Sequence, residues 1–261
     1  MVFYDKQSIT LFRITAFIDG QRGDLCFDYR RKLGCERMIR FNACQAGYGK
    51  QVVTPVVDGE ILPGTLTALV GVNGCGKSTL LKTVAGLLPA VSGECRVSLA
   101  RKKIGWLPQR SELERQFPLT VFELVAMGCW PATGWFRGIN RQLRHQIMQA
   151  LAATGMENFA DARPAMLSGG QLQRVLFSRL LMQQSELWLL DEPFSGIDQQ
   201  TIISLMTLIH QQQRSGTTIV VVLHDQRLVE QNFRQVLSLE GENACWYSSE
   251  SEQQGTLRLC C

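Results

Sequence analysis

Residues 71–78, GVNGCGKS, have the spacing of a phosphate-binding loop. They fit the pattern G-x-x-x-x-G-K-[ST], and we call them the phosphate loop. An apolar run, Leu66–Val70, precedes them, and a helix-like run over 79–88 follows. This strand, loop and helix order is the context in which backbone N–H groups and a lysine hold the phosphates of a nucleotide. The segment therefore predicts a nucleotide triphosphate site.

A second motif, LSGGQ at residues 167–171, precedes a segment with helical spacing. Ser168 and the glycines would open a helix whose N-terminal amides favour an anion. One nucleotide cannot easily use both motifs of a single compact domain. We therefore expect two chains, each lending its second motif to the nucleotide of the other.

Two carboxylates, Asp191 and Glu192, follow the buried, strand-like run Leu187–Leu190. Ligands of open α/β sheets bind at the carboxyl ends of such strands. In P-loop ATPases the first carboxylate holds magnesium together with the loop hydroxyl, here Ser78. Glu192 is then placed to polarise an attacking water as a general base. An acidic pair after a strand is by itself more often a solvated turn, but the phosphate loop favours the site.

Two further polar residues end predicted strands. His224 follows an apolar run over 219–223, and Gln109 ends the strand that contains Leu107. A lone histidine is usually structural. At this edge of the sheet, however, His224 can donate a hydrogen bond to a γ-phosphate, and Gln109 can contact magnesium or the attacking water.

The elements that position these side chains follow from periodicity and capping signals. Residues 119–166 are predicted to be mainly helical, with Thr120 as an N-cap and Glu123 completing a capping box. A loop over 130–140 divides this stretch, and a second helix is predicted from about Arg141 to Ala153. From residue 186 strands and helices alternate, with a helix predicted over Gln199–Arg214. Such alternation predicts a parallel sheet with right-handed crossovers, interrupted by a helical insertion.

Residues 1–37 differ from the rest of the chain because they are rich in arginine and lack a clear period. Met38 then opens a strand-like segment over 38–43, which we predict to be the first strand of the domain. Two interpretations stay open: Met38 is the true start of the protein, or residues 1–37 are a native surface extension. Neither gives the extension a chemical role.

Composition narrows the class of protein. The net charge is +4 over 261 residues, with half of it in residues 1–37, which argues against nucleic acid as a partner. No apolar run approaches the length needed to span a bilayer. The nine cysteines include no C-x-x-C pair and suit a reducing cytosol.

From about Met38 to its end, the chain resembles an ATP-binding cassette (ABC) ATPase. The resemblance makes residues 167–171 the family signature motif and 195–198 its D-loop, with Gly196 where the family often has alanine. It makes Glu192, His224 and Gln109 catalytic, and it assigns the magnesium of Mg-ATP to Ser78, Gln109 and Asp191. The residues implied to contact nucleotide are Tyr48, which would stack on adenine, and Gly71, Asn73, Gly74, Cys75, Gly76, Lys77, Ser78, Thr79, Ser168, Gly169, Gly170, Gln171 and Asp198.

The resemblance also implies an architecture and partners. The expected fold is α/β: a P-loop NTPase core with a mostly parallel sheet, an antiparallel N-terminal β part and a helical subdomain at about 110–175, all within an ABC domain over 38–261. ATP and Mg²⁺ are the implied ligands. The implied partners are a second copy in a head-to-tail ATP sandwich, a polytopic permease at the cytoplasmic face of the membrane and, indirectly, a substrate-binding protein.

Within the family, several short sequence segments resemble those of the ATPase subunits of zinc and manganese importers. They are residues 106–109, 117–121, 125–128 ahead of 134–136, 172–177 and 191–194. Iron-chelate importers share some of these segments, so the ATPase of such an importer remains an alternative function. An ATPase of iron–sulfur assembly is a further alternative. Chromosome-type members need a long coiled coil between the phosphate loop and the signature motif, and this chain has no sustained heptads there.

Overall fold

The computed structural model describes residues 37–109, 119–130 and 139–248 of the chain. Of the predicted extension over 1–37, only Arg37 lies within the described residues. Segments 117–118 and 134–136, which carry part of the resemblance to zinc and manganese importers, lie outside the described residues, and so does part of the predicted subdomain at 110–175. Among the described helices, none has the length and apolar character that crossing a bilayer requires.

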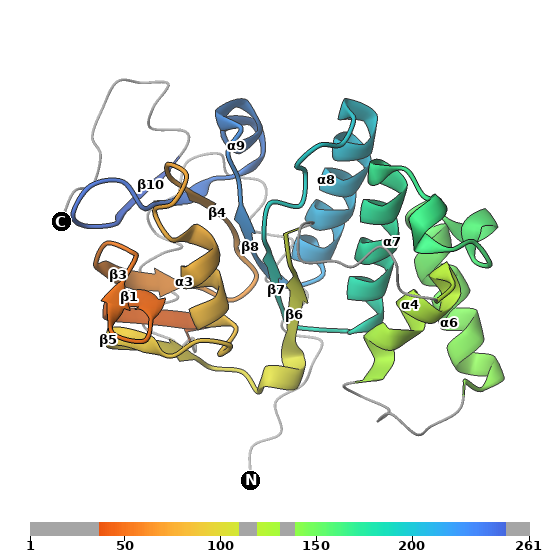
Figure 1. The fold of residues 1–261 in the computed structure, drawn as a ribbon, viewed down its shortest axis with the longest axis horizontal. Coiled ribbons are helices and arrows are strands. Elements are labelled where there is room, and N and C mark those ends of the chain that lie inside the picture. Colours follow the sequence, from red (N-terminus) through yellow and green to blue (C-terminus); the bar gives the residue numbers. More distant parts are fainter. Residues whose placement is uncertain (1–36, 110–118, 131–138, 249–261) are drawn as a thin grey trace, which may run out of the picture. The chain divides into compact units, whose positions relative to one another are not determined.

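Within the described residues, six strands form a mostly parallel sheet in the order β10-β9-β4-β8-β7-β6 (Figure 1). The sheet is parallel from β9 to β6, and β10 pairs antiparallel with β9. Its strands are β4 (Leu66–Val70), β6 (Ile104–Leu107), β7 (Leu187–Leu190), β8 (Thr218–Val222), β9 (Gln235–Ser238) and β10 (Cys245–Ser248). The predicted fold class is confirmed.

A second, antiparallel sheet is centred on β1 (Ile39–Tyr48). This strand pairs with β2 (Gln51–Val52), β3 (Val57–Ile61) and β5 (Ala90–Val97). The strand runs beyond the predicted end at residue 43 because it continues through a bulge, where Ala43 has a φ of 42°. A bulge interrupts the alternation of inward and outward side chains, which hid the second half of the strand.

Helices cover both faces of the parallel sheet. On one face α3 (Lys77–Val84) packs between this sheet and the antiparallel one. On the other face lie α7 (Gly169–Met182) and α8 (Gln199–Arg214), and α4 (Val121–Ala126) and α6 (Arg141–Ala152) pack against α7 (Figure 1). The short α9 (Gln226–Asn232) follows β8.

Strand β7 shows how the core fixes the sheet between these layers. Leu187 and Leu189 pack toward α3, whereas Trp188 and Leu190 pack toward α7 and α8. All four are buried, as expected for a parallel strand covered on both faces. The carboxylates that follow β7 are therefore placed by a rigid element.

Helix boundaries agree with the sequence where a cap is encoded. Thr120 and Glu123 form the predicted capping box at α4, and Asp198 caps α8, which spans the predicted range. Helix α3 ends earlier than predicted, because Gly86 adopts a φ of 69° and the chain turns so that the Leu87 N–H bonds to the Lys82 carbonyl. A left-handed glycine at this position terminates a helix.

Candidate nucleotide site

The phosphate loop joins β4 to α3 through tightly packed glycines. Gly76 is the N-cap of α3, with a φ of 92°, and no side chain caps the first turn of the helix. A Cβ at this position would lie 2.5 Å from Thr54 Cγ2 and 3.1 Å from Val53 Cγ1. Only glycine suits this backbone, and the uncapped helix N-terminus favours an anion such as phosphate.

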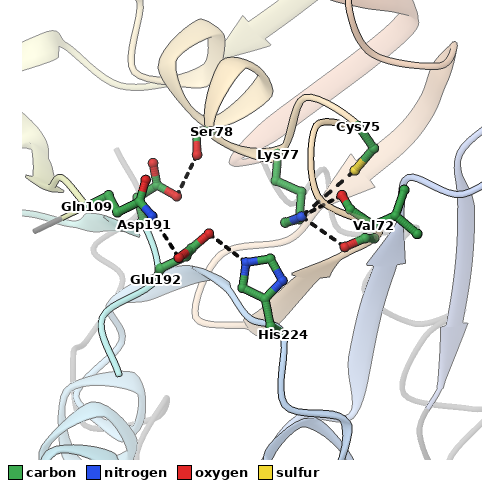
Figure 2. A network of polar contacts seen from close by, with 9 residues as sticks. Val72, Cys75, Lys77, Ser78, Gln109, Asp191, Glu192 and His224 are labelled. Atoms are coloured by element: carbon green, nitrogen blue, oxygen red, sulfur yellow. Dashed lines mark hydrogen bonds and ion pairs between the residues drawn. The ribbon is translucent and has the colours of Figure 1, made fainter. Parts of the chain in front are cut away.

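Lys77 is the cation of this loop. Its side chain is almost fully buried, and Nζ donates to the carbonyl oxygens of Gly71 and Val72 at 2.9 Å each (Figure 2). The sulfur of Cys75 lies 4.0 Å from the same nitrogen. An ammonium group has three donors, so the loop holds Lys77 at its centre, where it can meet phosphate oxygens.

Asp191 and Ser78 form an oxygen pair between the sheet and α3. Asp191 is only 1% exposed and follows β7 directly. The Ser78 hydroxyl donates a hydrogen bond to Asp191 Oδ1 at 2.9 Å (Figure 2). A carboxylate and a hydroxyl so placed are hard oxygen ligands of the kind that Mg²⁺ prefers, so the residues present fit that ion.

Glu192 lies at the centre of a polar network that three neighbouring strands assemble. Gln109 Nε2 donates to Glu192 Oε2 at 2.8 Å, and His224 Nε2 lies 2.5 Å from Glu192 Oε1 (Figure 2). The three side chains follow β6, β8 and β7, which are adjacent in the sheet. The carboxylate is half-buried, so it is shielded from solvent and yet reachable.

The backbone of Glu192 adopts a φ of 47°, the left-handed region that residues with a Cβ rarely occupy. Such a conformation costs on the order of 1–3 kcal/mol and persists only where the surroundings enforce it. Here the Ser195 N–H bonds to the Glu192 carbonyl at 3.3 Å and closes a turn. Strain of this kind is concentrated at functional sites, and the side chain of this residue contacts Gln109 and His224.

These groups surround one cavity of about 630 Å³. It is lined by Val53, Asn73, Gly74, Gly76, Lys77, Ser78, Thr79, Gln109, Glu192 and His224. The structure thus brings together the phosphate loop, Gln109, the carboxylate network and His224. Three predicted residues, Gly71, Cys75 and Asp191, contact Lys77 or Ser78 but are not part of this lining. Tyr48 and Asp198 also lie outside it: Tyr48, 53% exposed, ends β1, and Asp198 is the exposed N-cap of α8.

The signature motif also lies outside that lining. Ser168 is the N-cap of α7, and its hydroxyl accepts from the Gln171 N–H at 3.2 Å. In return the Gln171 side-chain oxygen accepts from the Ser168 N–H at 2.9 Å. Part of this helix N-terminus is therefore satisfied by its own capping box, while Ser168 itself is exposed.

Sequence reasoning missed the segment that follows β2. Val53 lines the cavity, and Thr54 is buried beneath Gly76 and accepts the Ala46 N–H at 2.8 Å. No motif marks these residues, because their role depends on a fold that brings the antiparallel sheet against the phosphate loop. Gly76 is the one indirect signal in the sequence, because a glycine can mark a point where another segment packs closely against the backbone.

The fold and the phosphate loop together define a P-loop nucleotide-binding protein. Comparisons with known proteins agree with this class: the family model described as ABC transporter matches residues 56–195. The zinc transport system ATP-binding protein TroB of Treponema pallidum is 40% identical over 197 residues, covering 74% of each chain. The manganese transport system ATP-binding protein MntB of Listeria monocytogenes is 41% identical over 199 residues, covering 74% of this chain and 82% of that one.

Solved structures share the fold. A nucleotide-free ATP-binding cassette from an ABC transporter has a TM-score of 0.72 at 18% identity and covers 84% of this chain and 94% of its own. A dimeric ATP-binding cassette in a post-hydrolysis state, bound to ADP and Pi, has a TM-score of 0.69 at 24% identity and covers 81% of this chain and 99% of its own. The chain belongs to the ABC transporter family, and it is an ATPase of that family coupled to transport.

Proposed function

We propose that this ATPase energises the import of a zinc or manganese ion through a membrane permease, with Glu192 as the general base. The observation that carries the catalytic part is the Gln109–Glu192–His224 network beside the phosphate loop. The choice of cargo is supported by relatives named for zinc and manganese transport that cover most of this chain. The cargo ion is substrate of the permease, and this chain would not bind it.

In this proposal the chain holds ATP by its phosphates. Lys77 would exchange its two carbonyl contacts for β- and γ-phosphate oxygens, and the amides at the start of α3 would hold the rest. Ser78, Asp191 and Gln109 would hold Mg²⁺, which neutralises charge that develops on the phosphates. Tyr48 would stack on the adenine from the β1–β2 hairpin, whose following residue Val53 lines the cavity.

Glu192 would then take the proton of the water that attacks the γ-phosphate, giving ADP and phosphate. Each of its two oxygens already accepts one hydrogen bond, but a carboxylate offers about four lone-pair positions, so a water can still donate to it. Gln109 and His224 would fix the orientation of the carboxylate and reach the water and the γ-phosphate.

The proposed working unit is a head-to-tail pair of these chains. The signature motif lies outside the lining of the cavity, and one chain therefore lacks the second anion site over its own nucleotide. In the pair, residues 168–171 and Asp198 of one copy would close the site of the other, at the cytoplasmic face of the membrane. A polytopic permease would bind each copy, and a substrate-binding protein would deliver the ion to that permease.

Two experiments test the cargo and the partner. A tagged chain isolated from detergent-solubilised membranes should retain a polytopic membrane protein, whereas a soluble scaffold in its place would contradict the transporter assignment.

Cells lacking the chain should lose uptake of radioactive zinc or manganese and regain it with the wild-type chain, but not with Glu192→Gln. Loss of iron-chelate uptake alone would overturn the choice of cargo and leave the ATPase assignment intact.

A further inference from the structure

The first turn of α8 packs directly against the signature motif of the same chain. Asp198, the N-cap of α8, accepts the Thr201 N–H at 2.9 Å through Oδ1. A Cβ at Gly170 would lie 3.1 Å from Asp198 Oδ2 and 3.2 Å from Thr201 Oγ1, closer than ordinary van der Waals contact. A side chain at position 170 would therefore require the cap of α8 to give way by a few tenths of an ångström.

A chain of hydrogen bonds extends this contact one turn along α7. Arg174 Nη2 donates to Thr201 Oγ1 at 2.9 Å, and the same hydroxyl donates to Asp198 Oδ2 at 2.8 Å. Thr201 is only 2% exposed, so its hydroxyl is committed to these two partners. The Nε of Arg174 is buried without a hydrogen-bond partner in the described part of the chain, so the bond to Thr201 anchors this guanidinium.

The charges favour the same arrangement. The backbone N–H and the hydroxyl of Thr201, with a smaller contribution from the Arg174 charge, hold the pKa of Asp198 below its usual value. Asp198 therefore remains a charged acceptor at neutral pH, and charge-assisted hydrogen bonds of this kind are stronger than neutral ones.

Asp198 is only a few residues from the general base. Residues 195–198 connect it to the turn in which the Ser195 N–H bonds to the Glu192 carbonyl. Helices α7 and α8 lie side by side on one face of the parallel sheet (Figure 1). A continuous set of contacts therefore runs from the signature end of α7 to the start of α8 and on to the turn that contains Glu192.

We infer that Arg174 and Thr201 are positioning residues that couple the signature motif to Asp198 and, through residues 195–198, to Glu192. Neither side chain lines the nucleotide cavity, so both act through the groups that they hold. The inference rests on the proposed function, since it takes Glu192 as the base. Its consequence is that a nucleotide gripped by the signature motif of one copy also sets the catalytic turn of that copy.

The test compares two substitutions at one buried position. Thr201→Val keeps the shape but removes the hydroxyl, whereas Thr201→Ser keeps the hydroxyl and is the matched control. Because a small misplacement of a reacting group is costly, Thr201→Val should lower kcat for ATP roughly tenfold or more and leave KM within about twofold. Thr201→Ser should retain a near wild-type kcat. A residue that only stabilised the fold would change the melting temperature without this split between kcat and KM.

A double-mutant cycle that combines Arg174→Ala with Thr201→Val tests the inference further by comparing the losses of kcat. If the two side chains act in one chain of bonds, the double variant should lose no more kcat than the worse single variant. Two results would each overturn the coupling: losses of kcat that add in the double variant, or equal kcat for Thr201→Val and Thr201→Ser. Glu192→Gln, assayed alongside, separates the two proposals: if it turns over at the wild-type rate, the assigned base is wrong, whatever Thr201 does.

Discussion

The left-handed backbone of Glu192 predicts an unusual order of stability among its variants. Its φ is 47°, where a residue with a Cβ is strained and glycine is not. Glu192→Ala and Glu192→Gly both remove the carboxylate and deprive Gln109 and His224 of the same acceptor. The difference between these two variants therefore isolates the backbone.

The magnitude follows from two opposing terms. A left-handed residue with a Cβ costs on the order of 1–3 kcal/mol. Glycine relieves this strain but loses roughly 0.5–1 kcal/mol through its greater freedom in the unfolded chain. The glycine variant should therefore be more stable than the alanine variant by about 1 kcal/mol. At an ordinary helical site the order is reversed, and alanine is favoured.

Urea unfolding at equilibrium measures this difference. With ordinary slopes for the free energy against urea, the midpoint of Glu192→Gly should lie roughly 0.3–1 M above that of Glu192→Ala. The matched control is Gln211, an exposed position in α8, where Gln211→Ala should be more stable than Gln211→Gly. An alanine variant at 192 as stable as the glycine variant would refute the claim that the fold holds this residue in a strained conformation.

Two further predictions concern the extension and the phosphate loop. Removing residues 1–37, so that the chain starts at Met38, should leave ATP turnover unchanged because every site residue lies downstream; loss of turnover would show that the extension supports the domain. A maleimide should inactivate the ATPase by adding bulk at Cys75, whose sulfur lies 4.0 Å from Lys77 Nζ, and prior ATP–magnesium should protect it. Cys75→Ala should stay active and lose most of this sensitivity, and equal sensitivity would place the target at another cysteine.

Local signals were enough to predict the central strands and the helices that begin at encoded caps. The apolar runs of β4 and β7, the Thr120–Glu123 capping box of α4 and the predicted range of α8 all agree with the structure. The site residues at the ends of these strands were predicted for the same reason. A parallel sheet brings the carboxyl ends of its strands to one edge, so their order along the chain does not matter.

Features that depend on distant partners were not predicted. Strands β9 and β10 are short, and β9 is held by pairing with β4, far away in the sequence. Val53 enters the cavity only because the antiparallel sheet packs on the phosphate loop. The contact of Gly170 with the α8 cap likewise arises from the packing of two helices. No window of the sequence contains both members of such pairs.

The most direct test of the central claim is the rate of ATP hydrolysis by Glu192→Gln beside its affinity for ATP. The amide keeps the shape of the side chain but cannot take the proton of water, so turnover should fall by a factor of roughly 100 or more. ATP binding should persist, because Lys77, Ser78 and Asp191 are unchanged, and light scattering should detect an ATP-bound dimer. Hydrolysis near the wild-type rate would contradict the assignment of Glu192 as the base.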